Sequence, residues 1–423
     1  MRVTSRVFVL VLALTLAVPA AVPAQDLSPS SPEAVGLSSD RLQRLTAALN
    51  GYVTDGKVAG GVVLVARHGK LAYHEPFGQR DREAASPMAR DAIFRIASQS
   101  KAIVSVGVMM LQEEGRLLIS DPVGRYLPEF QTTTVAVPRE LGGYDVVPAK
   151  RPVTIRDLLM HTAGVGYGQG VAADRWAQAG IQGWYFAHRD EPIGVTVRQM
   201  ATLPFDAHPG ERWVYGYSTD ILGAVVERVS GQPLDEFLRS RLFEPLGMRD
   251  THFYLPPEKA GRLAVVYSAT DRGLERAPDP GGATGQGAYV SGPRKSFSGG
   301  AGLVSTAGDY ARFLQMLLNG GTLDGRRLVS RKTVELMTTD HMAGTPFRDG
   351  QGFGLGFSVV TDLGARGLLG SPGEFAWGGA YHSTYWVDPK EGLVVVYMTQ
   401  LIPAGGLDDY GKLRALIYSA IVD

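Results

Sequence analysis

The chain of 423 residues contains no cysteine. Disulfide bonds, thiolate catalysis, lipid attachment at a cysteine and cysteine-ligated zinc are therefore all excluded. An excess of charge is also missing, because 42 basic side chains are balanced by 42 acidic ones. We therefore expect neither nucleic acid nor an anionic membrane surface as a partner.

Several catalytic motifs are absent as well. No Gly-x-Ser-x-Gly elbow occurs, which argues against an α/β-hydrolase with a Ser-His-Asp triad. The eight histidines are scattered and form no His-Glu-x-x-His pattern, and there is no phosphate loop or dinucleotide-binding glycine pattern. We expect neither a metal nor an organic cofactor.

The N-terminal segment has the three-part layout of a secretory signal peptide. Arg2 and Arg6 precede an apolar run at residues 7–18, and small residues follow up to Ala24. The run is too short to span a bilayer comfortably, and no other segment approaches that length. We predict a signal peptide at residues 1–24 and an exported protein, periplasmic or secreted, without a membrane span in its mature chain. An uncleaved anchor is the alternative.

Strand patterns occur at both ends of the chain, with helical patterns between them. GGVVLVARHGKLAYHEPFG, residues 60–78, predicts two strands around a turn. Strand patterns return in FGLGFSVVTD, FAWGGAYHSTYWVDP and GLVVVYMTQ, before a final helix. We therefore expect one sheet built from both termini, with residues 25–96 and 297–423 in the sheet domain. A mainly helical region would occupy residues 97–296, with the active site at the junction.

The most informative stretch is FRIASQSKAIVSVGVMMLQEEG, residues 94–115. From residue 102 to residue 111 the only polar side chain is Ser105, which predicts a helix buried on most of its surface. Lys101 stands at the start of this helix, where a cationic group is costly unless something pairs with it or uses it. Ser98 lies three residues earlier, so its hydroxyl and the amine share one helix face.

A serine hydroxyl needs a base to act as a nucleophile, and a lysine desolvated by an apolar helix can supply one. The helix N-terminus adds N–H groups and a positive dipole end that can hold an oxyanion. Ser-x-x-Lys alone leaves a second interpretation open, in which Ser98 caps the helix and Lys101 pairs with a carboxylate.

Two further segments follow Ser-x-x-Lys in order. HPGERWVYGYSTDILGAVVERVSG offers a tyrosine before a helix, and FAWGGAYHSTYWVDP offers a glycine pair on a strand. Together with LLMHTAGVG and SGGAGLVSTAGDYARFLQMLLNGG, this order resembles the serine β-lactamases and penicillin-recognising enzymes. It looks most like the family VIII carboxylesterases, which are similar to class C β-lactamases, over nearly the whole mature chain. The resemblance implies a mixed α/β (α+β), β-lactamase-like fold, with an antiparallel sheet flanked by helices and an inserted helical region.

The resemblance also implies roles for individual residues. Ser98 would be the acylated nucleophile and Lys101 its general base partner. Tyr215 matches the tyrosine of the second motif, which could shuttle a proton from Ser98 to the leaving group and then activate water. Tyr217 is the rival tyrosine. His161 falls in a loop that the family uses structurally.

Trp377-Gly378-Gly379 stands where β-lactamases have Lys-Thr-Gly. In the family the residue after this motif, here Ala380, shares the oxyanion with the N–H of Ser98. The missing lysine helps β-lactamases to hold the carboxylate of the lactam, so its absence favours an ester. The predicted substrate contacts are Trp377, Gly378, Gly379, Tyr217 and His382. Aromatic side chains between residues 167 and 186 could line a pocket or pack in a core.

We therefore expect a serine hydrolase that cleaves short-chain carboxylic esters through an acyl-enzyme, with a small-molecule ester as its partner. A β-lactamase or D,D-peptidase remains open, as does an acyltransferase that uses the same intermediate. A catalytically silent, penicillin-binding-like protein is a further alternative. The sequence does not give the oligomeric state.

Overall fold

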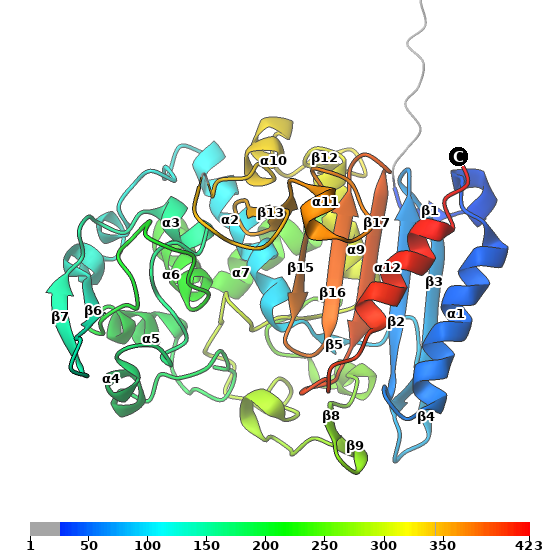
Figure 1. Cartoon of the computed structure of the whole chain (residues 1–423), viewed down its shortest axis with the longest axis horizontal. Coiled ribbons are helices and arrows are strands. Elements are labelled where there is room, and N and C mark those ends of the chain that lie inside the picture. Colours follow the sequence, from blue (N-terminus) through cyan, green and yellow to red (C-terminus); the bar gives the residue numbers. More distant parts are fainter. Residues whose placement is uncertain (1–25, 343) are drawn as a thin grey trace, which may run out of the picture.

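The computed structural model describes residues 26–342 and 344–423, so the predicted signal peptide lies outside the described residues. A large sheet draws its strands from both ends of the chain (Figure 1). Its strands pair antiparallel, except that the short N-terminal strand runs parallel to its neighbour. In order across the sheet they are β1 (Ser28–Pro29), β3 (Lys70–Asp81), β2 (Gly60–Arg67), β17 (Leu393–Thr399), β16 (Ser383–Asp388), β15 (Phe375–Gly379), β14 (Ser358–Val360) and β13 (Gln351–Phe353), with β4 (Ser86–Pro87) paired to β3. The predicted antiparallel sheet built from both termini is confirmed.

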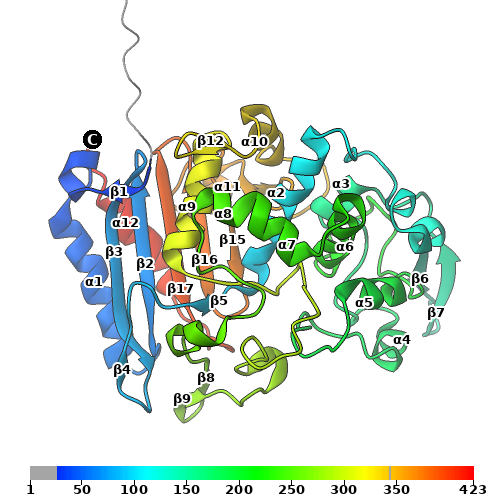
Figure 2. The same cartoon turned by 180° about the vertical axis from the view of Figure 1, so that it is seen from behind.

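Helices cover both faces of the sheet. α1 (Ser39–Thr54) and α12 (Asp409–Ser419) lie on one face, and α9 (Ala307–Leu318) lies on the other (Figures 1 and 2). All residues of β2 are therefore buried. Val63 and Val65 pack with the α1 and α12 layer, whereas Val62 and Leu64 pack with the α9 layer, as the two-residue period of a strand requires.

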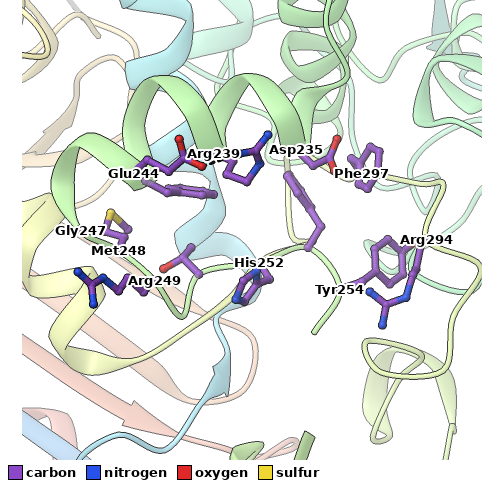
Figure 3. Close-up of a pocket in the computed structure, with 13 residues that line it drawn as sticks. Asp235, Arg239, Glu244, Gly247, Met248, Arg249, His252, Tyr254, Arg294 and Phe297 are labelled. Atoms are coloured by element: carbon purple, nitrogen blue, oxygen red, sulfur yellow. Dashed lines mark hydrogen bonds and ion pairs between the residues drawn. The ribbon is translucent and has the colours of Figure 1, made fainter. Parts of the chain in front are cut away.

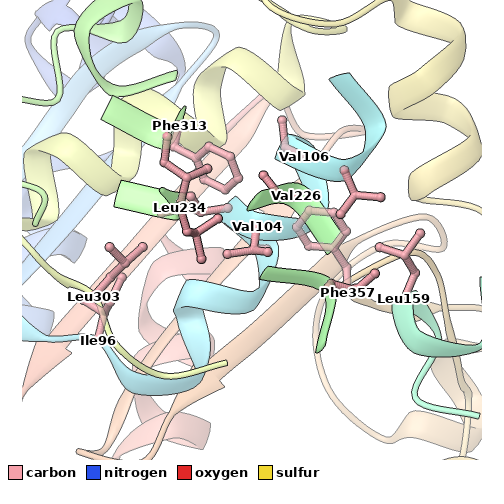
Figure 4. Close-up of a cluster of buried hydrophobic side chains, with 14 of the residues drawn as sticks. Ile96, Val104, Val106, Leu159, Val226, Leu234, Leu303, Phe313 and Phe357 are labelled. Carbon is pink, nitrogen blue, oxygen red and sulfur yellow. The ribbon is translucent and has the colours of Figure 1, made fainter. Parts of the chain in front are cut away.

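The predicted buried helix is α2 (Ser100–Glu113), which runs through the main core. Every residue from Ser100 to Leu111 is buried. Figure 4 shows Val104 and Val106 of this helix among apolar side chains from neighbouring segments, including Phe313 of α9. Fully burying one such side chain stabilises the fold by about 1.5–3 kcal/mol, so this packing fixes the helix that carries Ser-x-x-Lys.

Most of the helical region lies to one side of the sheet, but its second hairpin lies at one end of the strands, where Tyr267 pairs with Leu401 (Figure 1). Its elements are α3 (Ile155–Leu159), α4 (Ala173–Gln178), α5 (Ile193–Met200), α6 (Ser218–Ser230), α7 (Leu234–Leu238), α8 (Glu244–Leu246), the hairpin of β6 (Thr134–Pro138) and β7 (Tyr144–Pro148), and the hairpin of β8 (Tyr267–Thr270) and β9 (Gly273–Arg276). α6 is central, because it contacts α2, α3, α5 and α7. Every helix within the described ranges is too short or too polar to cross a membrane.

Several short elements complete the fold. They are β5 (Phe94–Arg95) paired with β10 (Val304–Ser305), β11 (Thr322–Leu323) paired with β12 (Arg326–Arg327), α10 (Arg331–Met337) and α11 (Leu363–Arg366). The β5–β10 pair joins the strand before Ser98 to the segment before α9, and so ties the start of α2 to the sheet domain.

Candidate active site

Ser98 lies in a tight connection between β5 and α2. A single 3-10 turn, Ala97–Gln99, continues directly into the helix. Ala97 has a φ of 41° although it is fully buried, and positive φ values are uncommon for residues other than glycine. Backbone strain of this kind clusters at functional sites, where the surrounding structure holds it in place. Ser98 itself is half-buried and lines a cavity of about 580 Å³.

Lys101 places its side-chain nitrogen among three oxygen atoms. Nζ donates to the carbonyl of Gly300 at 2.7 Å and to the hydroxyl of Tyr167 at 3.0 Å, and it lies 3.4 Å from Ser98 Oγ. The residue is 1% exposed. In the part of the chain that the structure describes, Nζ has no carboxylate within ion-pair distance, so Lys101 is not held by a simple salt bridge.

A buried acid nevertheless lies close to this group. Asp220, on α6, accepts hydrogen bonds from Ser298 Oγ at 2.6 Å and from the N–H of Gly300 at 3.1 Å. Burial raises the pKa of Asp220, while the hydrogen bond from Ser298 and the charge of Lys101 act in the opposite direction. Asp220 was not predicted from the sequence. The pattern that could have identified it is a single acidic residue within an apolar stretch of helix.

Tyr215 lies just before α6, and the face of its ring lies against the side chain of Lys101. The Lys101 nitrogen is 4.7 Å from the ring centroid, and the Tyr215 hydroxyl accepts a hydrogen bond from Trp377 Nε1 at 3.0 Å. The structure therefore brings Ser98, Lys101 and Tyr215 together. The hydroxyl that receives a hydrogen bond from Lys101 is that of Tyr167, to which sequence reasoning gave no catalytic part.

Tyr167 lies on the loop after α3, which begins with a capping box between Thr154 and Asp157. Its ring meets that of Tyr215 edge-on at 5.6 Å. Burial raises the pKa of Tyr167 well above its ordinary range, and the neighbouring Tyr215 hydroxyl raises it further. Tyr167 is therefore a neutral phenol that bridges Lys101 and Tyr215.

Trp377, Gly378 and Gly379 lie on the exposed edge of β15. This strand pairs with β16 along its whole length but with β14 only at Phe375 and Ala376, so the last three residues have a free side. All three line the cavity, as does Ala380. A Cβ at Gly379 would meet the carbonyl oxygen of Ile96 at 2.5 Å, so glycine permits the close approach of β15 to the segment that leads to Ser98.

The structure does not support two of the predicted substrate contacts. Tyr217 is fully buried, stacks on Trp176 and donates its hydroxyl to the carbonyl of Gly183 at 2.7 Å, so it is a core aromatic. His382 packs behind the cavity wall: its Nε2 lies 2.9 Å from the carboxylate of Asp409, and its ring stacks on Tyr410, which lines the cavity. Neither side chain lines the cavity that contains Ser98.

Aromatic rings pack behind Tyr215 and Trp377, which line the cavity. Trp213 stacks on Tyr215 at 5.4 Å, and Phe353 meets Trp377 edge-on at 5.3 Å. His161 packs behind Tyr215, and burial, with the charge of Lys101, lowers its pKa well below its ordinary value. A neutral, packed His161 agrees with the structural part predicted for its loop. Of the aromatic residues predicted between 167 and 186, only Tyr167 and Trp184 line the cavity.

Another cavity, of about 530 Å³, lies beside α7 and α8 (Figure 3). It mixes apolar rings such as Phe297 with charged groups, among which Arg239 and Glu244 form an ion pair. It contains no predicted site residue. Over residues 26–342 and 344–423, no group of three or more histidine or acidic side chains has the arrangement of a metal site.

A serine and a lysine one helical turn apart, a tyrosine against the lysine and a glycine-rich edge strand define a serine hydrolase of the Ser-x-x-Lys type. The chain belongs to the Beta-lactamase family, whose sequence model matches residues 44–417. The predicted resemblance and the β-lactamase-like fold are confirmed.

Individual relatives agree with this assignment. The chain is 35% identical over 393 residues to Esterase EstB of Burkholderia gladioli, covering 87% of this chain and 93% of that protein. It is 36% identical over 370 residues to Protein Rv1367c of Mycobacterium tuberculosis (strain ATCC 25618 / H37Rv), covering 84% and 88%. The solved structure of EstCE1, a hydrolase with promiscuous acyltransferase activity, matches with a TM-score of 0.77 at 28% identity, covering 89% of this chain and 98% of that one.

Proposed function

We propose that the chain hydrolyses short-chain carboxylic esters through an acyl-enzyme on Ser98. The observation that carries the proposal is the position of Lys101 Nζ, 3.4 Å from Ser98 Oγ and hydrogen-bonded to two other oxygen atoms. The names of two similar proteins, Esterase EstB and the hydrolase EstCE1, support the same reaction class.

The hydrogen bonds of Lys101 suit a base. A neutral amine has two N–H donors and one lone pair, and an ammonium has three donors. Gly300 and Tyr167 each accept one hydrogen bond, which leaves the third position of Nζ directed to Ser98 Oγ. With a neutral amine, this third position is the lone pair that takes the serine proton.

In the proposed reaction, Ser98 Oγ attacks the ester carbonyl carbon and its proton passes to Lys101. Tyr215 delivers a proton to the departing alcohol oxygen, which leaves the acyl group on Ser98. Water then attacks the acyl carbon and gives its proton to the Tyr215 oxygen, Lys101 returns its proton to Ser98 Oγ as the bond from the acyl carbon to that oxygen breaks, and the carboxylic acid is released. The N–H groups of Ser98 and Ala380 hold the oxyanion in both steps.

The test compares turnover of p-nitrophenyl butyrate and a chromogenic cephalosporin by the protein and by Ser98→Ala. We expect ester hydrolysis to fall by about a thousandfold or more in Ser98→Ala, because loss of a nucleophile removes the covalent route. Ser105→Ala is the matched control, since Ser105 is a buried serine of the same helix outside the cavity. Ester turnover that survives in Ser98→Ala would exclude the proposed nucleophile, and dominant cephalosporin turnover would identify a β-lactamase instead.

Acyl transfer is a second candidate function, favoured by the description of EstCE1 as a hydrolase with promiscuous acyltransferase activity. The aromatic wall of the cavity can hold an alcohol in place of water. Adding a primary alcohol to the ester assay tests it. Transfer is expected to yield the new ester, detected by chromatography, whereas free acid alone would rule transfer out under those conditions.

We also propose that residues 1–24 direct export of the protein to the periplasm or the medium. The basic start, short apolar run and small residues of this segment support the proposal. Expression of the full chain followed by N-terminal sequencing of the exported fraction is expected to begin at Gln25. A protein that keeps Met1 and stays with the membrane fraction would instead indicate an uncleaved anchor.

A further inference from the structure

The cavity that contains Ser98 is also lined by Arg348 and Arg366, each of which has guanidinium nitrogens without an acceptor on the described residues. Arg348, on the loop before β13, places its guanidinium 5.0 Å from the ring centroids of both Trp377 and Phe347. An arginine stays charged at any working pH, so Arg348 presents a cation at the mouth of the cavity. Its guanidinium has no hydrogen bond or ion pair to any of the described residues.

A second arginine lines the same cavity. Arg366, at the end of α11, is 6% exposed and donates to Glu374 at 3.0 Å. Two of its nitrogens, Nε and Nη1, are buried without a hydrogen-bond partner. Glu374 is also bound by Arg414 at 2.6 and 2.8 Å, so one carboxylate serves two guanidinium groups. Buried Asp388 joins this cluster through the Tyr418 hydroxyl, which donates to Glu374 and to Asp388, so two acids face two arginines, and the groups left unmatched are the two Arg366 nitrogens without an acceptor.

The two arginines come from adjacent segments. Gly350, two residues after Arg348, packs so closely on α11 that a Cβ there would lie 2.5 Å from the backbone nitrogen of Arg366 and 2.9 Å from its Cβ. The loop before β13 and the end of α11 therefore form one corner of the cavity wall. The unpaired nitrogens of Arg366 are buried, which is costly unless an anion from outside supplies an acceptor, whereas Arg348 is exposed and its guanidinium is open to such an anion.

This corner lies on the side of the leaving group. Trp377 donates to the hydroxyl of Tyr215, and Arg348 stacks on the Trp377 ring. In the proposed function, Tyr215 delivers the proton to the alcohol oxygen, so the alcohol half of the substrate must extend toward Trp377. A group attached to that half would meet Arg348 first.

We propose that Arg348 and Arg366 form a cationic subsite that binds a carboxylate carried by the alcohol half of the ester. The inference rests on the proposed function and names its substrate class, esters in which a hydroxy acid is the alcohol. A planar guanidinium binds a carboxylate with two parallel hydrogen bonds, which orients the substrate as well as attracting it. Hydrolysis then releases a hydroxycarboxylate and a short carboxylic acid.

The test compares 4-(butyryloxy)benzoate with 4-(butyryloxy)benzamide, which share an acyl group and differ in the charge of the alcohol half. For each protein, the ratio of kcat/KM for the charged ester to that for the neutral ester measures the preference. We expect a preference of about tenfold, the effect of one hydrogen-bonded charge. It should be lost in Arg348→Gln, be partly kept in Arg348→Lys and decrease with added salt.

Arg272→Gln is the control, because it removes the same charge from an exposed arginine that pairs with Glu275 outside the cavity. Its ratio should equal that of the unchanged protein. An equal rate on both esters, or a preference that survives in Arg348→Gln, would overturn the subsite. If the unchanged protein hydrolyses none of these esters, p-nitrophenyl butyrate included, the proposed function itself would be overturned.

Discussion

Tyr167 and Tyr215 contact Lys101 in different ways, so we expect them to have different catalytic roles, and their phenylalanine variants test this expectation. Tyr167 accepts a hydrogen bond from Lys101 at 3.0 Å, whereas Tyr215 offers Lys101 its ring and directs its hydroxyl toward Trp377 and the cavity. Tyr167→Phe removes one hydrogen bond to a charged or basic group, a loss of about 1.5–3 kcal/mol or roughly 10- to 100-fold in kcat/KM. Tyr215→Phe removes the proposed proton donor, for which general acid catalysis predicts a loss of about 100- to 10,000-fold.

The leaving group distinguishes these two effects. A p-nitrophenolate departs with little need of a proton, whereas an alkoxide needs one. We therefore expect Tyr215→Phe to lose far more activity on an ethyl ester than on a p-nitrophenyl ester with the same acyl group. Tyr167→Phe should lose the same factor on both, because it acts through Lys101 on the attack by Ser98. A leaving-group dependence in Tyr167→Phe and none in Tyr215→Phe would refute this expectation and make Tyr167 the proton donor.

Two further predictions concern the frame of the site and the pH dependence of stability. Gly379→Ala forces a Cβ to within 2.5 Å of the Ile96 carbonyl oxygen, so kcat/KM should fall by about 100-fold because Ser98 is displaced. Gly51→Ala is the control, because Gly51 has open space around it, and its kcat/KM should not change. Full activity in Gly379→Ala would show that this contact does not position the site. Burial raises the pKa of Asp309 from 3.8 to about 6, so the native state holds a proton there between pH 4 and 6 and the free energy of unfolding falls as pH rises through that window. Asp309→Asn should remove this pH dependence. In urea titrations, its free energy of unfolding relative to that of the unchanged protein should therefore rise by up to about 3 kcal/mol between pH 4 and pH 8. A difference in free energy that stays constant across this range would contradict the prediction.

The sequence was sufficient for features that depend on local spacing. Ser98 and Lys101 meet because residues three apart on a helix share a face, and the apolar run after them predicts the buried helix. The glycine pair after Trp377 predicts a strand that something approaches closely, and in the structure Gly379 lies against Ile96. The motif order given by the resemblance then placed Tyr215 beside Lys101.

Contacts between distant segments could not be predicted in this way. Tyr167 reaches Lys101 only because the loop after α3 folds back on α2, and Asp220 acts through Gly300, 80 residues away. Nearness in sequence also misled the predictions for Tyr217 and His382. Tyr217 is two residues from Tyr215, but it precedes α6 directly and turns into the core. His382 lies in the turn between β15 and β16, with a φ of 60°, and turns toward α12.

In the proposed subsite, Arg348 takes the part that the lysine of Lys-Thr-Gly has in β-lactamases, that of holding a carboxylate of the substrate. At the position of that lysine, Trp377 supplies a ring rather than a cation, and Arg348 is stacked on this ring at the cavity mouth. Lys101 is almost completely buried and is held by Gly300 and Tyr167, so it acts on Ser98 and does not reach a distant part of the substrate. In the proposed subsite, recognition of a carboxylate therefore falls to Arg348, which contacts the Trp377 ring. A β-lactam holds its carboxylate close to the scissile bond, whereas the alcohol half of an ester can carry one farther away, so a subsite at Arg348 favours esters.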